Sequence, residues 1–271
     1  MQLRQCKHGQ RFRRVAVSTM AAGSQRWALL SSWFSSKVIN MKVFVLTGAG
    51  ISAESGIPTF RGINGLWKGH RVEDVATPAA FTKNPELVHE FYNERRRQFL
   101  QKNIQPNAAH FALAEFEKTH ADDFLLVTQN IDPLHFTAGS RNVLPMHGQL
   151  LEARCTVTGK VVPWTNDLSV CTADPENQHR IGNLRPNVVW FGEMPLGVQR
   201  IQEAVQNADL FLAIGTSAVV YPAAGLVEQT PANCKRVEIN LEETPKSDAF
   251  TETIRGRASI EVPKFLSRLQ A

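Results

Sequence analysis

Short runs of β-branched and aliphatic residues alternate, from Lys42 onward, with longer segments whose apolar residues recur at helical spacing. The runs are compact and mostly apolar: VFVL (43–46), FLLVT (124–128), LFLAIG (210–215) and RVEINL (236–241). Strands of this kind are buried on both faces, which is typical of a parallel sheet covered by helices. The alternation therefore predicts an α/β fold with a doubly wound, Rossmann-like parallel sheet.

Two segments between these runs are predicted to be helices. They read PELVHEFYNERRRQFL (85–100) and PNAAHFALAEFEKTH (106–120), and each opens on a proline, which is favoured in the first turn of a helix. Residues 151–188 break the alternation, because they hold turn-forming residues and two cysteines but no long helical segment. We predict a domain over residues 42–271 that carries a small inserted module at about 151–188.

The composition fits one enzyme-sized domain with a sizeable core, since the chain has 271 residues of which 43% are hydrophobic. Its net charge of +5 comes from the first 42 residues, which hold eight basic side chains and no acidic one. The remainder carries 22 basic and 25 acidic residues, a net charge of −3. The charge therefore does not point to a nucleic-acid partner.

The basic N-terminal segment, residues 1–41, is kept apart from the predicted domain. It is rich in Arg and Ser, and three interpretations stay open: an organelle transit peptide, a solvated tail, or sequence upstream of a start at Met20 or Met41. No apolar run reaches the roughly 18 residues needed to cross a membrane, and the four cysteines are scattered. We expect a cytoplasmic protein without a membrane partner, or a mitochondrial one if the segment is a transit peptide.

A glycine motif follows the first predicted strand. Gly48-Ala49-Gly50-Ile-Ser-Ala53 has the form G-x-G-x-x-A, which is typical of dinucleotide-binding loops. A Rossmann dehydrogenase would also carry an acidic residue about 20 residues further on, at the end of its second strand, to bind a ribose. Glu73 and Asp74 lie near that distance, but RVEDVATP is not a strand pattern. The motif therefore predicts a dinucleotide site without favouring hydride transfer, and Asn240 and Glu242 are better placed for the ribose.

Polar residues also follow two other predicted strands. Ligands of such sheets bind beyond the carboxyl ends of the strands, where the segment Gln129-Asn130-Ile131-Asp132 and His147 fall. An imidazole with a pKa near 6.5 accepts a proton at neutral pH, so His147 is a candidate general base. We expect His135 to orient a neighbour, and the other histidines to be packing or surface residues: His8, His70, His89, His110, His120 and His179.

Six motifs together resemble those of the sirtuins, the NAD-dependent protein-lysine deacylases: GAGISAESGIPTFRG, TQNIDPLHFTAG, MHG, VVWFGE, GTS and INLE. The resemblance covers residues 42–268 and is greatest to bacterial CobB-type sirtuins of the desuccinylase and demalonylase class. It implies a zinc-ribbon-like inserted module, NAD as cofactor, and acyl-lysine proteins or peptides as substrates. In that family the acyl oxygen attacks the nicotinamide ribose, and the products are nicotinamide, free lysine and 2′-O-acyl-ADP-ribose.

The resemblance also implies roles for individual residues. His147 matches the catalytic base, with Asn130 beside it, and Phe60 and Arg61 match residues that cover the reacting ribose and exclude water. The implied cofactor set is Gly48, Ala49, Gly50, Ala53, Thr59, Phe60, Arg61, Trp67, Gln129, Asn130, Ile131, Asp132, Gly215, Thr216, Ser217, Asn240, Leu241, Glu242 and Ala258. The implied substrate set is Ala76, Tyr92, Arg95, Val189, Phe191, Gly192, Glu193 and Tyr221. Two structural alternatives stay open: Ser217 as a helix cap, and VVWFGE as a buried strand.

The predicted helix 85–100 carries a candidate acyl-recognition pair. Tyr92 and Arg95 are three residues apart and share a helix face. A guanidinium fork and a hydroxyl suit the distal carboxylate of a succinyl or malonyl group, and the family resemblance links the same Y-x-x-R to the desuccinylase class. Ala76 stands where acetyl-preferring relatives tend to have a bulky aromatic residue. We expect Arg96 and Arg97 to lie on a solvated helix face.

The sequence does not decide whether the inserted module binds a metal. Many sirtuins have two C-x-x-C pairs there, which bind zinc tetrahedrally. In this chain Cys155 is followed by Thr158, and Cys171 by Asp174, at the positions of the partner cysteines. If zinc binds, Cys155 and Cys171 are the expected ligands, with Asp174 or His179 completing a weaker site.

Two other functions are compatible with the same motifs. A sirtuin-fold ADP-ribosyltransferase would keep the cofactor residues and transfer ADP-ribose to protein. A non-catalytic sensor of NAD or acyl-lysine would tolerate loss of the base, and the presence of His147 and Asn130 argues against it.

Overall fold

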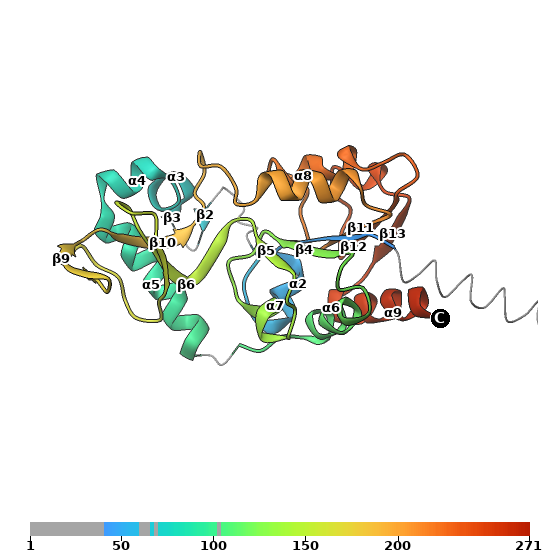
Figure 1. Cartoon of the computed structure of the whole chain (residues 1–271), viewed down its shortest axis with the longest axis horizontal. Helices are drawn as coiled ribbons and strands as arrows, with labels where there is room; N and C mark the ends of the chain where they lie inside the picture. Colours follow the sequence, from blue (N-terminus) through green and yellow to red (C-terminus); the bar gives the residue numbers. More distant parts are fainter. Residues whose placement is uncertain (1–40, 60–65, 68–69, 102–103) are drawn as a thin grey trace, which may run out of the picture. The chain divides into compact units, whose positions relative to one another are not determined.

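A six-stranded parallel sheet forms the centre of the domain (Figure 1). The computed structural model describes residues 41–59, 66–67, 70–101 and 104–271, with the side chains of 66–67 excepted. The strand order is β13-β12-β11-β1-β4-β5, and every neighbouring pair is parallel. The bounds are β1 Val43–Thr47, β4 Phe124–Thr128, β5 Val143–Pro145, β11 Leu210–Ile214, β12 Lys235–Asn240 and β13 Glu252–Arg255. The four strands predicted from the apolar runs are confirmed.

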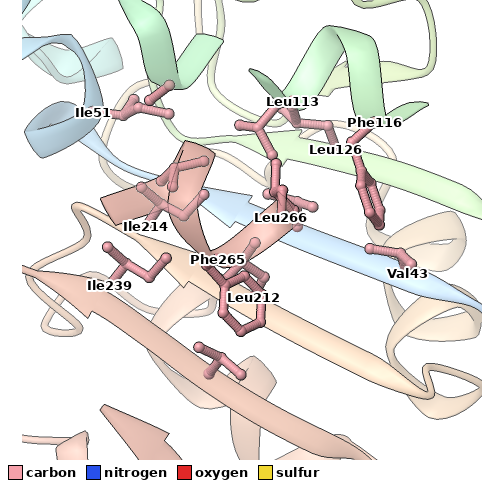
Figure 2. Close-up of a cluster of buried hydrophobic side chains, with 14 of the residues drawn as sticks. Val43, Ile51, Leu113, Phe116, Leu126, Leu212, Ile214, Ile239, Phe265 and Leu266 are labelled. Atoms are coloured by element: carbon pink, nitrogen blue, oxygen red, sulfur yellow. The ribbon is translucent and has the colours of Figure 1, made fainter. Parts of the chain in front are cut away.

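Helices cover both faces of the sheet. On one face, α6 (Ala108–Thr119) and α9 (Ala258–Gln270) pack their apolar sides against residues such as Val43, Leu126 and Ile239 (Figure 2). On the other face, α8 (Val198–Gln206) and the 3-10 segment η2 (Ala223–Gln229) pack against residues such as Phe44 and Phe211. Because β1, β4 and β11 each contribute buried side chains to both clusters, the doubly wound prediction is confirmed.

The shorter elements connect these layers. After β1 come α2 (Ala49–Ser52) and η1 (Ala53–Ser55), and after β4 comes α7 (Leu134–Thr137). The 3-10 segment η3 (Ser247–Ala249) precedes β13. Among the described residues, no helix is long and apolar enough to cross a membrane.

A second sheet lies apart from the parallel one and is antiparallel. Its order is β10-β6-β7, with β6 Gly148–Cys155, β7 Val161–Pro163 and β10 Leu184–Val188. A two-stranded ribbon of β8 (Ala173–Asp174) and β9 (Asn177–Ile181) is inserted before β10. Residues 148–188 therefore form a small β-rich unit without a helix, which begins three residues before the boundary expected from the sequence.

Three helices from earlier in the chain pack on this small sheet. They are α3 (Val72–Val75), α4 (Pro78–Lys83) and α5 (Pro85–Gln101), and they share an apolar cluster with Leu150 of β6 and Val188 of β10. Two short strands, β2 (Leu66–Trp67) and β3 (His70–Arg71), pair just before α3. Helical periodicity gives α5 an apolar face but does not say which sheet that face covers.

Arg96 corrects one sequence expectation. It is fully buried rather than solvated, and its guanidinium donates to the carbonyl oxygen of Leu150 (3.2 Å), to Asn93 Oδ1 (2.9 Å) and to the carbonyl oxygen of Asn166 (3.1 Å). One residue further, Arg97 lies at the surface and pairs with Glu90 and Asp167. Successive helical residues are rotated by about 100°, so one arginine of the run faces the small sheet and the next faces solvent.

Candidate active site

The predicted site residues gather because the parallel strands all end at one edge. The segment 48–50 follows β1, 129–132 follows β4, 215–217 follows β11, and 240–242 follows β12. These four strands are neighbours in the sheet, so the loops after them meet. The arrangement brings together residues that are almost 200 positions apart in the chain.

The loops after β1 and β11 touch through their backbones. Gly50 N donates to the carbonyl oxygen of Gly215 (2.8 Å), and a Cβ atom on Gly50 would lie 2.6 Å from Gly215 Cα. A Cβ atom on Gly48 would lie 2.8 Å from the carbonyl oxygen of Gly215, and Gly215 itself has a φ of +60°. Glycine is therefore required here first by the close approach of two loops. The motif G-x-G-x-x-A predicts a dinucleotide-binding loop, but it does not reveal this contact between two loops.

A buried polar cluster lies between the β1 and β4 loops. Asn130 donates from Nδ2 to the carbonyl oxygen of Gly48 (3.1 Å) and to Ser52 Oγ (3.2 Å), and Ser52 donates to Asp132 Oδ2 (3.0 Å). Burial raises the pKa of Asp132 to about 6, although hydrogen bonds from Leu134 N and Ser52 oppose the shift. Ser52 is fully buried and joins the two predicted residues. It was not predicted; its signal is a serine inside the short turn GAGIS.

A second set of hydrogen bonds joins the loops after β4, β11 and β12. Gln129 donates from Nε2 to Thr216 Oγ1 (2.9 Å), and Asn240 donates from Nδ2 to the carbonyl oxygen of Thr216 (2.8 Å). Thr47, the last residue of β1, pairs with the buried His135 through Oγ1 and Nε2 (3.0 Å). His135 thus orients a neighbour, as expected from the sequence.

His147 is half-buried after β5 and is held in one orientation. Its Nδ1 lies 2.9 Å from the carbonyl oxygen of Gln129. A carbonyl can only accept, so Nδ1 carries the ring proton and Nε2 carries the lone pair. Burial lowers the pKa of His147, with the hydrogen bond to Gln129 acting in the opposite direction. The imidazole is therefore neutral at pH 7 and able to accept a proton at Nε2.

A cavity of about 670 Å³ lies between the strand-end loops and the small β-rich unit with its helices. From the predicted cofactor set it is lined by Gly48, Ala49, Gly50, Thr59, Gln129, Asn130, Ile131, Asp132, Gly215, Thr216 and Ser217. His147 lines it as well, together with the whole predicted substrate set: Ala76, Tyr92, Arg95, Val189, Phe191, Gly192, Glu193 and Tyr221. The structure therefore brings the candidate base, the glycine loops and the candidate acyl-recognition pair to one cavity.

The remaining predicted cofactor residues are more scattered. Ala53 begins η1, Leu241 and Glu242 are exposed after β12, and the methyl group of Ala258 packs into the main core at the start of α9. Phe60 and Arg61 lie outside the described residues, and Trp67 is described only by its backbone in β2. Ser217 is not a helix cap, because η2 starts at Ala223 with Pro222 in the cap position.

The candidate acyl-recognition pair, Tyr92 and Arg95, is buried on α5. Tyr92 is fully buried and its hydroxyl oxygen accepts from Trp190 Nε1 (3.1 Å). The Arg95 guanidinium lies 3.2 Å above the ring centre of Phe91 and donates to the carbonyl oxygen of Phe91 (2.6 Å). Burial lowers the pKa of Arg95 to about 10, so it keeps its charge at neutral pH. A cation and a hydroxyl thus line one side of an otherwise largely apolar part of the cavity.

The segment after β10 forms an edge of the cavity instead of a buried strand. β10 ends at Val188, and the next residues adopt an irregular conformation with Gly192 at a φ of +92°. Phe191 N donates to the carbonyl oxygen of Ala76 (3.0 Å), whereas the Phe191 side chain is exposed. Across the cavity, Tyr221 is exposed too. The buried-strand alternative for VVWFGE therefore holds only for its first residue, Val188.

The two cysteines of the small unit do not provide a zinc site. Cys155 is buried and its thiol hydrogen-bonds to Asp174, whereas Cys171 is exposed. Asp174 accepts from Glu176 N (2.9 Å) and lies 3.6 Å from Arg180. Within the part of the chain that the structure describes, no three residues of the types His, Cys, Asp and Glu come together to hold a metal. A closed tetrahedral zinc site needs four such ligands, so these residues do not fit one.

Comparison with known proteins gives a consistent result. A family model described as the Sir2 family matches residues 48–222. A protein of Rhodopirellula baltica named NAD-dependent protein deacylase is 63% identical over 238 residues, which cover 85% of this chain and 100% of that protein. An Escherichia coli K12 protein of the same name is 54% identical over 233 residues, covering 84% and 82%. The crystal structure of a Sir2 homologue–NAD complex is similar with a TM-score of 0.76 and 38% identity, covering 89% of this chain and 93% of that one.

Proposed function

The chain belongs to the Sir2 family and is an NAD-dependent protein deacylase, and from this premise we propose which residues carry the reaction and which acyl groups are accepted. The proposal rests on one observation. Tyr92 and Arg95 line the same cavity as His147 and the glycine loops. A cation and a hydroxyl are therefore within one cavity with the base, and they suit acyl groups that end in a carboxylate.

The residues of the strand-end loops fit a bound dinucleotide. We assign the phosphates to the loops 48–50 and 215–217, whose glycines leave no side chain in the way, and the adenosine ribose to Asn240 and Glu242. When bound, NAD supplies the ribose that takes up the acyl group, with nicotinamide as the leaving group. Phe60 and Arg61 are assigned to cover that ribose, as the sequence predicts.

His147 is the proposed general base. Its Nδ1 proton is engaged by the carbonyl oxygen of Gln129, so Nε2 accepts the proton of a ribose hydroxyl. Because burial lowers the pKa of the ring, His147 is in its basic form at neutral pH. Gln129 is also the residue that binds Thr216, so the position of the base is tied to the second phosphate loop.

Asn130 is proposed to hold a ribose hydroxyl or a water molecule beside the base. Both N–H groups of its amide are used in bonds to Gly48 and Ser52. The group that it offers to a ligand is therefore the acceptor Oδ1. Asp132 fixes Ser52 and has further acceptor capacity on both oxygens, which suits the amide of nicotinamide.

The acyl preference is proposed to be for succinyl and malonyl groups, with acetyl also removed. Arg95 offers its guanidinium and Tyr92 its hydroxyl to the distal carboxylate, and the small side chain of Ala76 leaves space for the chain between lysine and that carboxylate. An acetyl group does not reach these two residues and gains nothing from them.

The test is kcat/KM on matched succinyl-, malonyl- and acetyl-lysine peptides with NAD, for wild type and Arg95→Met. A charge-assisted bond contributes about 1.5–3 kcal/mol, so the efficiency on the acidic acyl groups should fall by one to two orders of magnitude. Deacetylation should stay the same or rise slightly. The matched control is Arg97→Met, the same change at the surface of the same helix. Equal losses on acidic and neutral acyl groups in Arg95→Met would contradict the assignment.

A further inference from the structure

Arg185, a buried residue of β10, directs its guanidinium at the segment that follows this strand. It donates to the two carboxylate oxygens of Glu193 (2.7 and 3.0 Å) and to the carbonyl oxygen of Val188 (2.7 Å). The guanidinium carbon also lies 3.3 Å from the ring centre of Trp190. No role for Arg185 was predicted from the sequence. One side chain thus contacts the beginning, the middle and the end of residues 188–193.

Residues 190–193 form a tight turn at the edge of the cavity. Glu193 N donates to the carbonyl oxygen of Trp190 (3.0 Å), and Gly192, in the third position of the turn, has a φ of +92°, which favours glycine. A Cβ atom added at Gly192 would meet no described atom within 4 Å apart from its chain neighbours, and Gly192 lines the cavity. The tip of the turn is therefore accessible to a ligand in the cavity.

The carboxylate of Glu193 is used within the turn itself. Besides the two bonds from Arg185, its Oε2 accepts from Trp190 N (2.8 Å), so three of its roughly four acceptor sites are occupied. Burial acts to raise the pKa of Glu193, but the hydrogen bonds from Arg185 and from Trp190 N outweigh it and lower the pKa. The group is therefore ionised at neutral pH and forms a charge-assisted pair with Arg185.

The same segment is attached to two neighbours in the candidate active site. Val189 N donates to the carbonyl oxygen of His147 (2.9 Å), and Phe191 N donates to the carbonyl oxygen of Ala76 (3.0 Å). The turn is thus joined to the proposed base on one side and to the helices of the acyl side on the other. Its placement decides how a peptide bound at this edge lies relative to His147.

We propose that Arg185 is a positioning residue for peptide binding, because it binds Glu193, stacks on Trp190 and thereby fixes the turn 190–193 in the shape that meets the backbone of an acyl-lysine peptide. The carboxylate of Glu193 then acts through Arg185 and does not contact a basic residue of the peptide. Recognition at this edge is independent of the acyl group and of the charge of the residues that flank the acyl-lysine. The inference rests on the proposed substrate role of residues 189–193.

The experiment is a double-mutant cycle of Arg185→Met and Glu193→Gln, read as kcat and KM at saturating NAD. The substrates are an acetyl-lysine peptide with neutral flanking residues, the same peptide with basic flanking residues, and a single acetyl-lysine with both ends blocked. Arg185→Met should raise the KM of both peptides about 10- to 100-fold. The KM of the single residue should change little, because it offers almost no backbone to the turn. The double variant should lose little more than Arg185→Met, since both changes break the same pair.

Arg154→Met is the matched control. Arg154 lies opposite Arg185 in the register of β6 and β10 and is near the same carboxylate, but at 3.7 Å and with a more exposed side chain. Its loss should change the peptide KM by less than about 5-fold. A variant that only folds less well lowers kcat through fewer active molecules and leaves KM unchanged, so the peptide KM separates positioning from stability. An equal rise of the peptide KM in Arg154→Met would contradict a specific role of Arg185.

The outcomes separate this proposal from the proposed function. A wild-type enzyme that uses the single residue as efficiently as the peptides would contradict the proposed substrate edge, and with it the role of Arg185. A preference for peptides that Arg185→Met leaves unchanged, or strictly additive losses in the cycle, would overturn the role of Arg185 alone. A loss in Glu193→Gln confined to the basic peptide would do the same, because it would mean a direct contact with the carboxylate.

A further variant keeps the test decisive if Arg185→Met does not fold. Arg185→Lys retains the charge and loses the planar fork that binds both carboxylate oxygens. Its peptide KM should lie between those of wild type and Glu193→Gln or above both. An unchanged peptide KM in both Arg185→Lys and Glu193→Gln would overturn the proposal.

Discussion

One wall of the cavity is held together mainly by backbone contacts and short side chains, and the other wall by long side chains. On the side of the strand-end loops, the decisive contacts are backbone to backbone, as between Gly50 and Gly215, or involve short side chains such as Ser52 and Asn130. On the side of α5 and the segment after β10, long side chains from distant positions meet, as Tyr92 and Trp190 do. We infer that changes in the first wall affect every substrate, whereas changes in the second wall alter the choice among substrates.

The largest effect is expected from a change of the proposed base, His147, in the first wall. His147→Ala should lower the rate of removal of succinyl and acetyl groups alike, because a positioned base contributes about 10²–10⁴-fold. The melting temperature and NAD affinity should change little, since His147 is half-buried and its ring is held by the hydrogen bond to the carbonyl oxygen of Gln129. Single-turnover rates on both peptides provide the measurement. A loss of rate on only one of the two acyl groups would contradict the inference that this wall affects every substrate.

The next effect tests the loop contact. Gly50→Ala places a Cβ atom 2.6 Å from Gly215 Cα, so the two loops must move apart. We expect a loss of unfolding free energy of about 1–3 kcal/mol or more, together with weakened NAD binding for every substrate. Chemical denaturation and calorimetric NAD titration measure the two. Gly225→Ala is the control, because its added carbon would meet Tyr221 at an ordinary 3.4 Å.

A third change tests whether the second wall depends on the packing of α5. Arg96→Met leaves the carbonyl oxygens of Leu150 and Asn166 and the amide of Asn93 without this donor. The expected loss of unfolding free energy is about 2–4 kcal/mol. The succinyl-to-acetyl ratio should fall with it, since α5 also carries Tyr92 and Arg95. Arg97→Met should cost no more than about 1 kcal/mol, as is usual for surface ion pairs.

The pH dependence sharpens the assignment of the base. Since burial lowers the pKa of His147, the neutral ring persists below the ordinary value of 6.5. The acid limb of kcat/KM should therefore lie below pH 6.5, with the same midpoint for both acyl groups. Asp132, with a pKa of about 6, titrates in the same range, so the profile is measured in Asp132→Asn as well. An acid limb above pH 6.5 in that variant would be incompatible with His147 as a buried neutral base.

The smallest expected effect concerns metal removal. A closed zinc site needs four ligands. In the small β-rich unit, the carboxylate of Asp174 instead interacts with Cys155, with the backbone N–H of Glu176 and with Arg180. Treatment with a strong chelator should leave the melting temperature and both deacylation rates unchanged. A structural zinc ion stabilises small domains by about 10–16 kcal/mol, so a bound ion would be obvious from its loss. Metal analysis of the purified protein is the companion measurement.

The two walls also differ in how far the sequence predicts them. The strands and the loops after them follow from local patterns, because a buried parallel strand is a short apolar run and its end is where polar residues begin. Ser52 was not predicted because its partners Asn130 and Asp132 lie 78 and 80 positions away in the chain. Arg96 was wrongly expected at the surface for a related reason: its partner Leu150 belongs to another element. Trp190 shows the same limit, since only the folded chain brings it to Tyr92.

The contact between Gly50 and Gly215 also restricts which amino-acid substitutions this protein can accept. When a larger residue enters a packed core, a smaller one opposite often restores the fit. Here both partners already lack a side chain, and a Cβ atom on Gly48 would also meet the carbonyl oxygen of Gly215, at 2.8 Å. Among the described residues, the nearest atoms to an added carbon at Gly50 are backbone atoms of Gly215, and shortening a side chain does not move a backbone. Variation in this enzyme is thereby directed to the opposite wall, where one side chain can be exchanged for another and a new acyl group can be accepted.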